Sequence, residues 1–131
     1  MKLFYFLTVQ DIIRLHDKSI ERFGGAPGIR DIGLLESAAA QPSMFLFNKQ
    51  IHETIFHMAA AYAFHIIKNH AFIDGNKRAG ILAALTFLEK NNHIITTDPD
   101  TLYQLTLAIA QSEISTNEIA TFFKESCTKS R

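Results

Sequence analysis

The sequence contains one cysteine, no tryptophan and no excess of either charge. Because Cys127 has no second cysteine to pair with, an internal disulfide is excluded, which fits a reducing compartment and a cytoplasmic location. Thirteen Lys and Arg residues balance thirteen Asp and Glu residues, so the formal net charge is zero. A neutral chain has no long-range field that attracts nucleic acid, so we expect no direct nucleic-acid binding and only local cationic sites.

Long hydrophobic runs and a targeting segment are also missing. The apolar residues 3–7 are followed by Thr8, Gln10 and Asp11, which interrupt the run before it reaches the length of a signal peptide. No later segment approaches the roughly 18 consecutive apolar residues that a membrane-spanning helix needs. We therefore expect a soluble protein that does not bind a membrane.

Apolar residues are abundant, at 47% of a 131-residue chain, and eleven of them are Phe. This content is enough for one hydrophobic core, so a single domain is predicted over residues 1–131. Helical spacing of the apolar positions predicts an all-α fold, a compact bundle around a central apolar helix with a short N-terminal extended segment. The expected helices cover residues 9–23, 32–40, 51–67, 80–88 (the central one), 99–112 and 116–123. A short strand at residues 93–96 and a polar C-terminal tail complete the prediction.

Several of these helices carry capping signals. Thr8 with Asp11 has the spacing of a capping box, and so does Ser115 with Glu118. Asp98 precedes a proline at the first helical position, where a missing N–H costs nothing. These signals fix the expected helix starts independently of the apolar pattern.

The glycine-rich loop at residues 24–28 allows two interpretations. A phosphate-binding P-loop needs a lysine and a serine or threonine after its last glycine, whereas Ile29 and Arg30 follow here. A plain turn between two helices is therefore favoured, and phosphate binding is the alternative.

Residues 43–50 contain three large apolar side chains without a clear period. They can form a loop whose aromatic side chains fill the core, or a mobile flap that docks a protein partner beside the active site. The sequence leaves both interpretations open.

The histidines do not have the spacing of a zinc site. His52 and His57 are five residues apart, and so are His65 and His70. On a helix this spacing turns the side chains about 140° apart, whereas paired ligands need positions three or four residues apart. A zinc site is not expected.

Residues 69–79 are the most chemically dense part of the chain, and they join two apolar helices. The turn at residues 74–76 opens the second helix, whose first N–H groups have no partner within the helix and point outward. The helix dipole and the cations of Lys77 and Arg78 add positive charge at the same place. This combination predicts a polyphosphate site.

Three further residues in this junction suggest specific roles. Asp74 is a hard oxygen ligand suited to Mg²⁺, which binds proteins through one or two carboxylates together with phosphate oxygens. His70 carries an imidazole, the side chain best suited to exchange protons near neutral pH, and can take a proton from an attacking hydroxyl. Phe72 lies between them and is expected to anchor the loop in the core. Each residue alone has an ordinary structural explanation, but together they predict a phosphate-transfer site.

The sequence His-Ala-Phe-Ile-Asp-Gly-Asn-Lys-Arg at residues 70–78 resembles the core motif of the Fic/Doc superfamily. The lysine after Asn76 resembles the death-on-curing (Doc) branch, because Fic enzymes usually have glycine there and a second arginine three residues after the first. This chain has Lys77 and Ile81 at those two positions. Further segments that look like the Doc branch are residues 15–17, 23–25 and 28–38, so the resemblance covers most of the chain.

The resemblance implies an all-α fold with the motif before a central helix, and ATP and Mg²⁺ as cofactors. It implies that His70 is the catalytic base, that Asp74 is both catalytic and the Mg²⁺ ligand, and that Arg78 takes part in catalysis. It also implies a phosphate cradle made by Gly75, Asn76, Lys77 and Arg78.

Fic enzymes transfer AMP to a protein hydroxyl, whereas Doc toxins are kinases that phosphorylate elongation factor Tu and arrest translation. A side chain at Lys77 fills the space that glycine leaves for the α-phosphate. We therefore expect the nucleotide to bind reversed and to present its γ-phosphate to a Ser or Thr hydroxyl activated by His70. AMP transfer is the alternative, and a non-catalytic partner-binding module is a third possibility.

Many Fic proteins carry a self-inhibitory helix with the pattern Ser/Thr-x-x-x-Glu-Gly/Asn. The nearest approach here is Thr121 to Glu125 followed by Ser126, which does not match. Inhibition is then expected in trans, from a Phd-like antitoxin of a type II toxin–antitoxin pair.

Overall fold

The computed structural model describes residues 4–46 and 49–129, and in these ranges the chain forms six α-helices. The helices are α1 (Val9–Phe23), α2 (Ile32–Ala40), α3 (Ile55–Asn69), α4 (Asn76–Lys90), α5 (Pro99–Ala110) and α6 (Thr116–Glu125). The short elements are the 3-10 helix η1 (Gln41–Ser43) and the strands β1 (Phe45–Leu46), β2 (Lys49–Gln50), β3 (His93–Ile95) and β4 (Cys127–Lys129). The predicted all-α class is confirmed.

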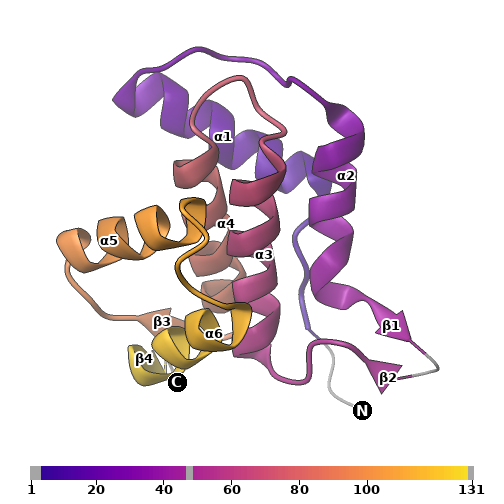
Figure 1. Ribbon diagram of the computed structural model, residues 1–131, viewed down its shortest axis with the longest axis vertical. Helices are drawn as coiled ribbons and strands as arrows, with labels where there is room; N and C mark the ends of the chain where they lie inside the picture. Colours follow the sequence, from indigo (N-terminus) through magenta and orange to yellow (C-terminus); the bar gives the residue numbers. More distant parts are fainter. Residues whose placement is uncertain (1–3, 47–48, 130–131) are drawn as a thin grey trace.

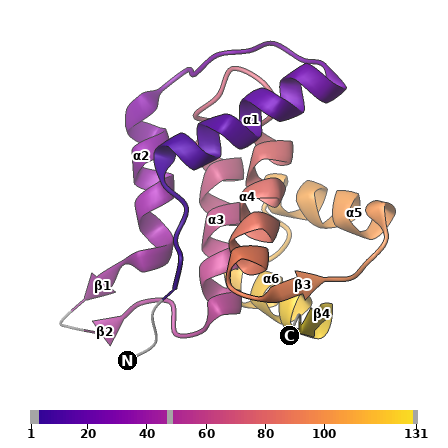
Figure 2. The ribbon, with the colours of Figure 1, turned by 180° about the vertical axis from the view of Figure 1, so that it is seen from behind.

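Helices α3 and α4 lie side by side at the centre of the molecule (Figures 1 and 2). Small residues allow this close approach: a Cβ added to Gly80 of α4 would lie 2.6 Å from Ile67 Cγ1 and 3.1 Å from the Ala63 carbonyl oxygen of α3. The buried face of α4 is formed mainly by Ala79, Gly80, Ala83, Ala84, Phe87 and Leu88. The centre of the bundle is therefore a helix pair, to which the predicted central helix contributes one member.

The other elements surround this pair. Figure 1 shows α1 crossing one end of the pair, α2 and the β1–β2 hairpin on one side, and α5 and α6 on the other. The N-terminal arm before α1 is extended, and its Leu7 is buried and donates its N–H to the Tyr62 hydroxyl of α3 at 2.8 Å. None of the helices in the described ranges is long and apolar enough to cross a membrane.

The predicted capping boxes are present. Thr8 accepts a hydrogen bond from the Asp11 N–H while the Asp11 carboxylate accepts from the Thr8 N–H, and Ser115 and Glu118 pair in the same way. Asp98 caps α5 ahead of its first-turn proline. These reciprocal bonds explain why α1 and α6 begin where the sequence predicts.

Three expectations about these elements are wrong. Helix α3 begins at Ile55 instead of residue 51, because the Thr54 side chain accepts from the His57 N–H and caps the helix there. Helix α4 covers Asn76–Lys90 instead of residues 80–88, because it begins directly after the left-handed Gly75. The expected polar tail contains strand β4, which pairs antiparallel with β3. The two strands are more than thirty residues apart in the sequence, so the local pattern of apolar residues cannot predict their pairing.

Phe45, one of the aromatic residues in the stretch 43–50, does not fill the core. Strands β1 and β2 form an antiparallel hairpin in which Phe45 pairs with Gln50 and is 61% exposed. The core-filling interpretation is therefore wrong for Phe45, and Phe47 lies outside the described residues. Docking of a partner on this hairpin stays a prediction.

Phe23 also differs from its helical pattern, because it is 66% exposed at the end of α1.

Candidate active site

The loop between α3 and α4 begins and ends with left-handed residues. His70 caps the C-terminus of α3 with φ 51° and ψ 47°, and Gly75 precedes α4 with φ 77°. Such φ values are uncommon for residues other than glycine, so His70 holds a strained conformation that its surroundings must support. The predicted helix-loop-helix junction is confirmed.

Asn76 folds this loop from within. Its side chain is 7% exposed, accepts from the Phe72 N–H and donates to the Phe72 carbonyl, both at 3.0 Å. The same amide nitrogen lies 3.4 Å from Nδ1 of His70. The side chain of Asn76 therefore shapes the loop. What Asn76 can offer to a phosphate is its backbone N–H, at the start of α4.

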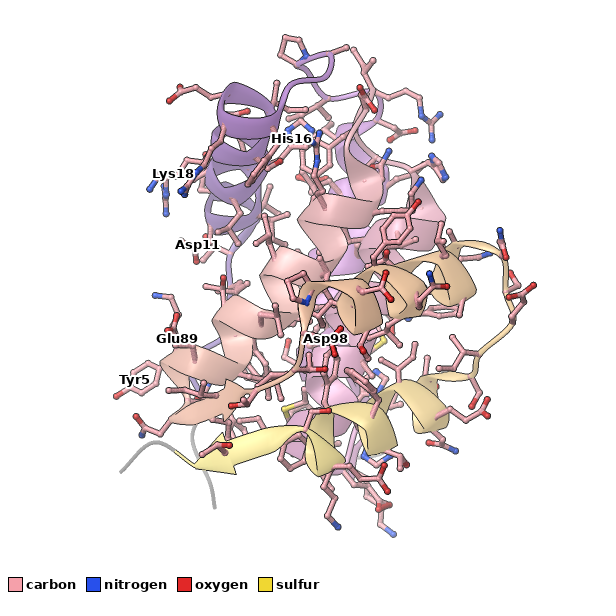
Figure 3. All side chains as sticks on the ribbon, turned by 90° about the vertical axis from the view of Figure 1, so that its left-hand side faces the viewer. Tyr5, Asp11, His16, Lys18, Glu89 and Asp98 are labelled. Atoms are coloured by element: carbon pink, nitrogen blue, oxygen red, sulfur yellow. The ribbon has the colours of Figure 1, made fainter. Side chains whose placement is uncertain are left out.

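His16 supports the loop from α1. Its side chain is only 1% exposed, its ring stacks on Phe72 at 3.8 Å, and Nε2 lies 2.7 Å from the Asp74 carbonyl oxygen. Because a carbonyl oxygen only accepts, Nε2 carries the proton. Figure 3 shows His16 on the side of α1 that faces α4, whereas Lys18 points away. The periodicity places His16 on the buried face, but it gives no indication of this contact.

Asp74 presents an ionised carboxylate at the mouth of the site. One oxygen accepts from the Ala26 N–H at 3.0 Å and the other from the Gly75 N–H at 2.8 Å. These bonds, with smaller contributions from Arg78 and His16, lower the pKa of Asp74 below its ordinary value. The group therefore keeps its negative charge well into the acidic range, as a cation ligand requires.

The glycine-rich loop is part of this site. The Gly24 carbonyl accepts from Nη2 of Arg78 at 2.8 Å, and a Cβ on Gly25 would lie 2.8 Å from an Asp74 carboxylate oxygen. Gly25 has φ 117°, a backbone conformation that residues with a side chain rarely adopt. The plain-turn interpretation missed this role, because nothing in the loop's own sequence indicates what it contacts.

A cleft of about 520 Å³ contains all six predicted site residues. Its volume is typical of a small-molecule site. The lining consists of Phe23, Gly24, Gly25, His70, Ile73, Asp74, Gly75, Asn76, Lys77, Arg78 and Ala110. A histidine, a carboxylate and two cations are thus brought to one hollow at the N-terminus of α4.

The side chains of this site fit Mg²⁺ only if phosphate oxygens complete its coordination. Within residues 4–46 and 49–129, no group of three or more His, Cys, Asp and Glu side chains could hold a metal ion. Mg²⁺ commonly binds through one carboxylate together with phosphate oxygens and water, which is what Asp74 beside a polyphosphate could provide.

A second hollow of about 280 Å³ adjoins the cations, between α4 and α5. It is lined by Lys77, Arg78, Ile81, Pro99, Leu102, Tyr103 and Thr106. The walls other than the two cations are largely apolar, so this groove suits an uncharged, flat part of a ligand whose anionic part lies on Lys77 and Arg78.

Comparison with known proteins gives consistent results. A family model described as the Fic/DOC family matches residues 6–88. The protein kinase doc of Escherichia phage P1 is 32% identical over 114 residues, which cover 87% of this chain and 89% of that protein. Toxin Doc of Mycolicibacterium smegmatis is 35% identical over 99 residues, which cover 76% of this chain and 70% of that protein.

Proposed function

Because the chain belongs to the Fic/Doc family, we propose that it is a Doc-type protein kinase that transfers the γ-phosphate of ATP to a Ser or Thr hydroxyl. The observation that carries this proposal is the single cleft that holds His70, the ionised Asp74 and the cationic start of α4. A base, a metal ligand and an anion cradle are the parts that phosphoryl transfer needs.

The proposed reaction assigns one role to each part. The imidazole of His70 takes the proton of the target hydroxyl, whose oxygen attacks the γ-phosphorus. The bond from the γ-phosphorus to the bridging oxygen breaks, and ADP leaves with the electron pair. When bound, Mg²⁺ neutralises phosphate charge. Asp74 would hold it, while Lys77, Arg78 and the N–H groups of Gly75 and Asn76 would hold the phosphates.

The role of Lys77 supports transfer of the γ-phosphate. Lys77 is exposed on the first turn of α4 and lines the cleft, where a glycine would leave open space. Its side chain reduces the room for an α-phosphate beside His70 and favours the reversed nucleotide. Ile81 offers no charge in the groove one turn further along α4, so a second phosphate-binding arginine is missing there.

The names of the relatives support a biological setting for this chain. One is named a protein kinase and the other a toxin. We propose that this chain is the toxin of a type II toxin–antitoxin pair, that a Phd-like antitoxin inhibits it in trans, and that its target is a translation factor such as elongation factor Tu. The exposed Phe23 and Ile73 at the rim of the cleft supply apolar surface for a protein to cover.

The first prediction concerns His70. Incubation of the protein with elongation factor Tu, Mg²⁺ and ATP labelled on the γ-phosphate is expected to label the target, and His70→Ala is expected to reduce the rate about 100-fold or more. His57→Ala, a histidine outside the cleft, serves as the matched control and should keep the wild-type rate. Label transferred from the α-phosphate instead would reject the kinase in favour of AMP transfer.

AMP transfer is the second candidate, and the apolar groove between α4 and α5 favours it. A nucleobase bound there would bring the α-phosphate toward Lys77 and Arg78 instead of the γ-phosphate. The non-catalytic module is separated from both enzymes by growth arrest. If His70→Ala arrests cells as strongly as the wild type, neither transfer reaction is the cause.

A further inference from the structure

The C-terminus of α3 needs support because the proposed base, His70, is the residue that caps it. His70 is a non-glycine residue in the left-handed region, with φ 51°. The final carbonyl groups of a helix have no N–H partners within the helix, so they must be satisfied from elsewhere. Any group that bonds these carbonyls also determines where the His70 side chain leaves the backbone.

Arg30 provides this support from a distant part of the chain. Its Nε donates to the His70 carbonyl at 2.7 Å, and its Nη2 donates to the Asn69 carbonyl at 3.2 Å. One planar guanidinium thus reaches two consecutive carbonyls, and its positive charge lies at the negative end of the helix dipole. Arg30 lies forty residues before His70, in the segment between α1 and α2.

The backbone around Arg30 is bonded to the same loop. The N–H groups of Arg30 and Asp31 both donate to the Ala71 carbonyl, at 2.7 and 3.0 Å, and the Ile73 N–H donates to the Gly28 carbonyl at 3.1 Å. Residues 28–31 therefore run along residues 71–73 as a short antiparallel brace. This brace keeps the Arg30 backbone beside the end of α3, within reach of the two carbonyls.

The loop is thus held at both ends by side chains from outside it. His16 binds the Asp74 carbonyl at the end that leads into α4, whereas Arg30 binds the carbonyls at the end that leaves α3. The His16 contact fixes the end that carries the proposed metal ligand Asp74, and the Arg30 contact fixes the end that carries the proposed base His70.

We propose that Arg30 is a positioning residue for His70, holding it in the left-handed conformation that turns its ring into the cleft. This inference rests on the proposed function, in which His70 takes a proton from the target hydroxyl. Arg30 does not line the cleft, so its effect passes through the His70 backbone and not through contact with substrate.

The kinetic test compares Arg30→Ala and Arg30→Lys with wild type, using Arg14→Ala as the control. Arg14 is an exposed arginine of α1 that bonds Asp11 in its own helix. Arg30→Ala is expected to lower kcat about 10- to 100-fold, as misplacing a catalytic group does, while KM for ATP stays unchanged because the cradle on α4 is intact. Arg30→Lys should recover part of the loss, since its ammonium can reach one carbonyl but lacks the fork.

A second readout does not depend on any transfer activity. The imidazole resonances of His70, assigned by their loss in His70→Ala, are expected to shift and broaden in Arg30→Ala and to stay in place in Arg14→Ala. If no transfer is detected in any variant, the proposed function fails, but this comparison still decides the role of Arg30. Unchanged His70 resonances in Arg30→Ala, whatever the change in melting temperature, would overturn the inference and leave Arg30 as a helix cap only.

Discussion

At the scale of single residues, the site depends on contacts that join its two sides. Asn76 bonds both backbone groups of Phe72, His16 bonds the Asp74 carbonyl, and Arg78 bonds the Gly24 carbonyl. Sequence patterns alone indicate none of these contacts. The patterns do place all the chemically active side chains in one junction. The reason is physical, because a motif specifies which groups are present and not how the loop folds. The bonds between Asn76 and Phe72 depend on the conformation of the loop, and the partners of Asp74 and Arg78 come from α1 and from the loop after it.

Gly25 gives the most specific prediction at this scale. Its Cβ would approach an Asp74 carboxylate oxygen to 2.8 Å and Nη2 of Arg78 to 3.1 Å, so Gly25→Ala must displace the loop or the two site residues. We expect phosphotransfer to fall about 10-fold or more, by analogy with other misplaced catalytic groups. Steady-state rates at saturating ATP measure this loss.

Gly24→Ala is the matched control for Gly25→Ala. Gly24 also has positive φ, at 89°, but a Cβ there would meet no atom within 4 Å. Both variants carry backbone strain of about 1 kcal/mol or more, so both should melt at lower temperature. Equal losses of rate in the two variants would show that strain, and not the contact with Asp74 and Arg78, matters at this loop.

At the scale of elements, the caps and apolar periods of the sequence determine most helices. Thr8, Ser115 and Asp98 act at the positions predicted, because a cap is a local hydrogen-bonding pattern. The start of α3 and the pairing of β3 with β4 were not predicted. The first depends on which of several polar residues becomes the cap, and the second on strands that are distant in sequence.

The contact between α3 and α4 yields a prediction for Gly80. A Cβ there would overlap Ile67, so Gly80→Ala should destabilise the fold by about 1–3 kcal/mol through overpacking, despite the better helix propensity of alanine. Urea unfolding of the variant measures the free energy.

Removing the opposing side chain tests the cause of this loss. Ile67→Ala opens space at the same contact, so the double variant Gly80→Ala/Ile67→Ala should lose less free energy than the sum of the single variants. Strict additivity would mean that Gly80 is not required by the contact with Ile67.

At the scale of the whole molecule, the net charge is zero, but two histidines make the stability of the fold depend on pH. Burial lowers the pKa of His65 and of His52, with a smaller effect of neighbouring histidines. Below about pH 6.5 the unfolded chain takes up protons at these histidines before the folded protein does, which favours unfolding. Stability is therefore present above pH 6.5 and falls as the pH decreases toward the lowered folded pKa values.

Melting temperatures between pH 7.5 and 5 test this linkage. The wild type should melt at lower temperature as the pH falls through this window, and His65→Gln should show a flatter dependence because one of the two groups is gone. Parallel curves for the two proteins would contradict the assignment to His65. A separate loss is expected only below about pH 4, where the carboxylates of Asp11, Asp98 and Glu118, whose pKa values are lowered by capping hydrogen bonds, become protonated.

The whole molecule also presents its chemistry at one end, where α1 and the glycine loop meet the junction of α3 and α4 (Figure 2). The decisive measurement of what this end does is the intact mass of elongation factor Tu after incubation with the protein, ATP and Mg²⁺. We predict the mass increase of one phosphate, present with wild type and with His57→Ala and absent with His70→Ala. An increase corresponding to AMP, or a phosphate gained equally with His70→Ala, would contradict γ-phosphate transfer at His70.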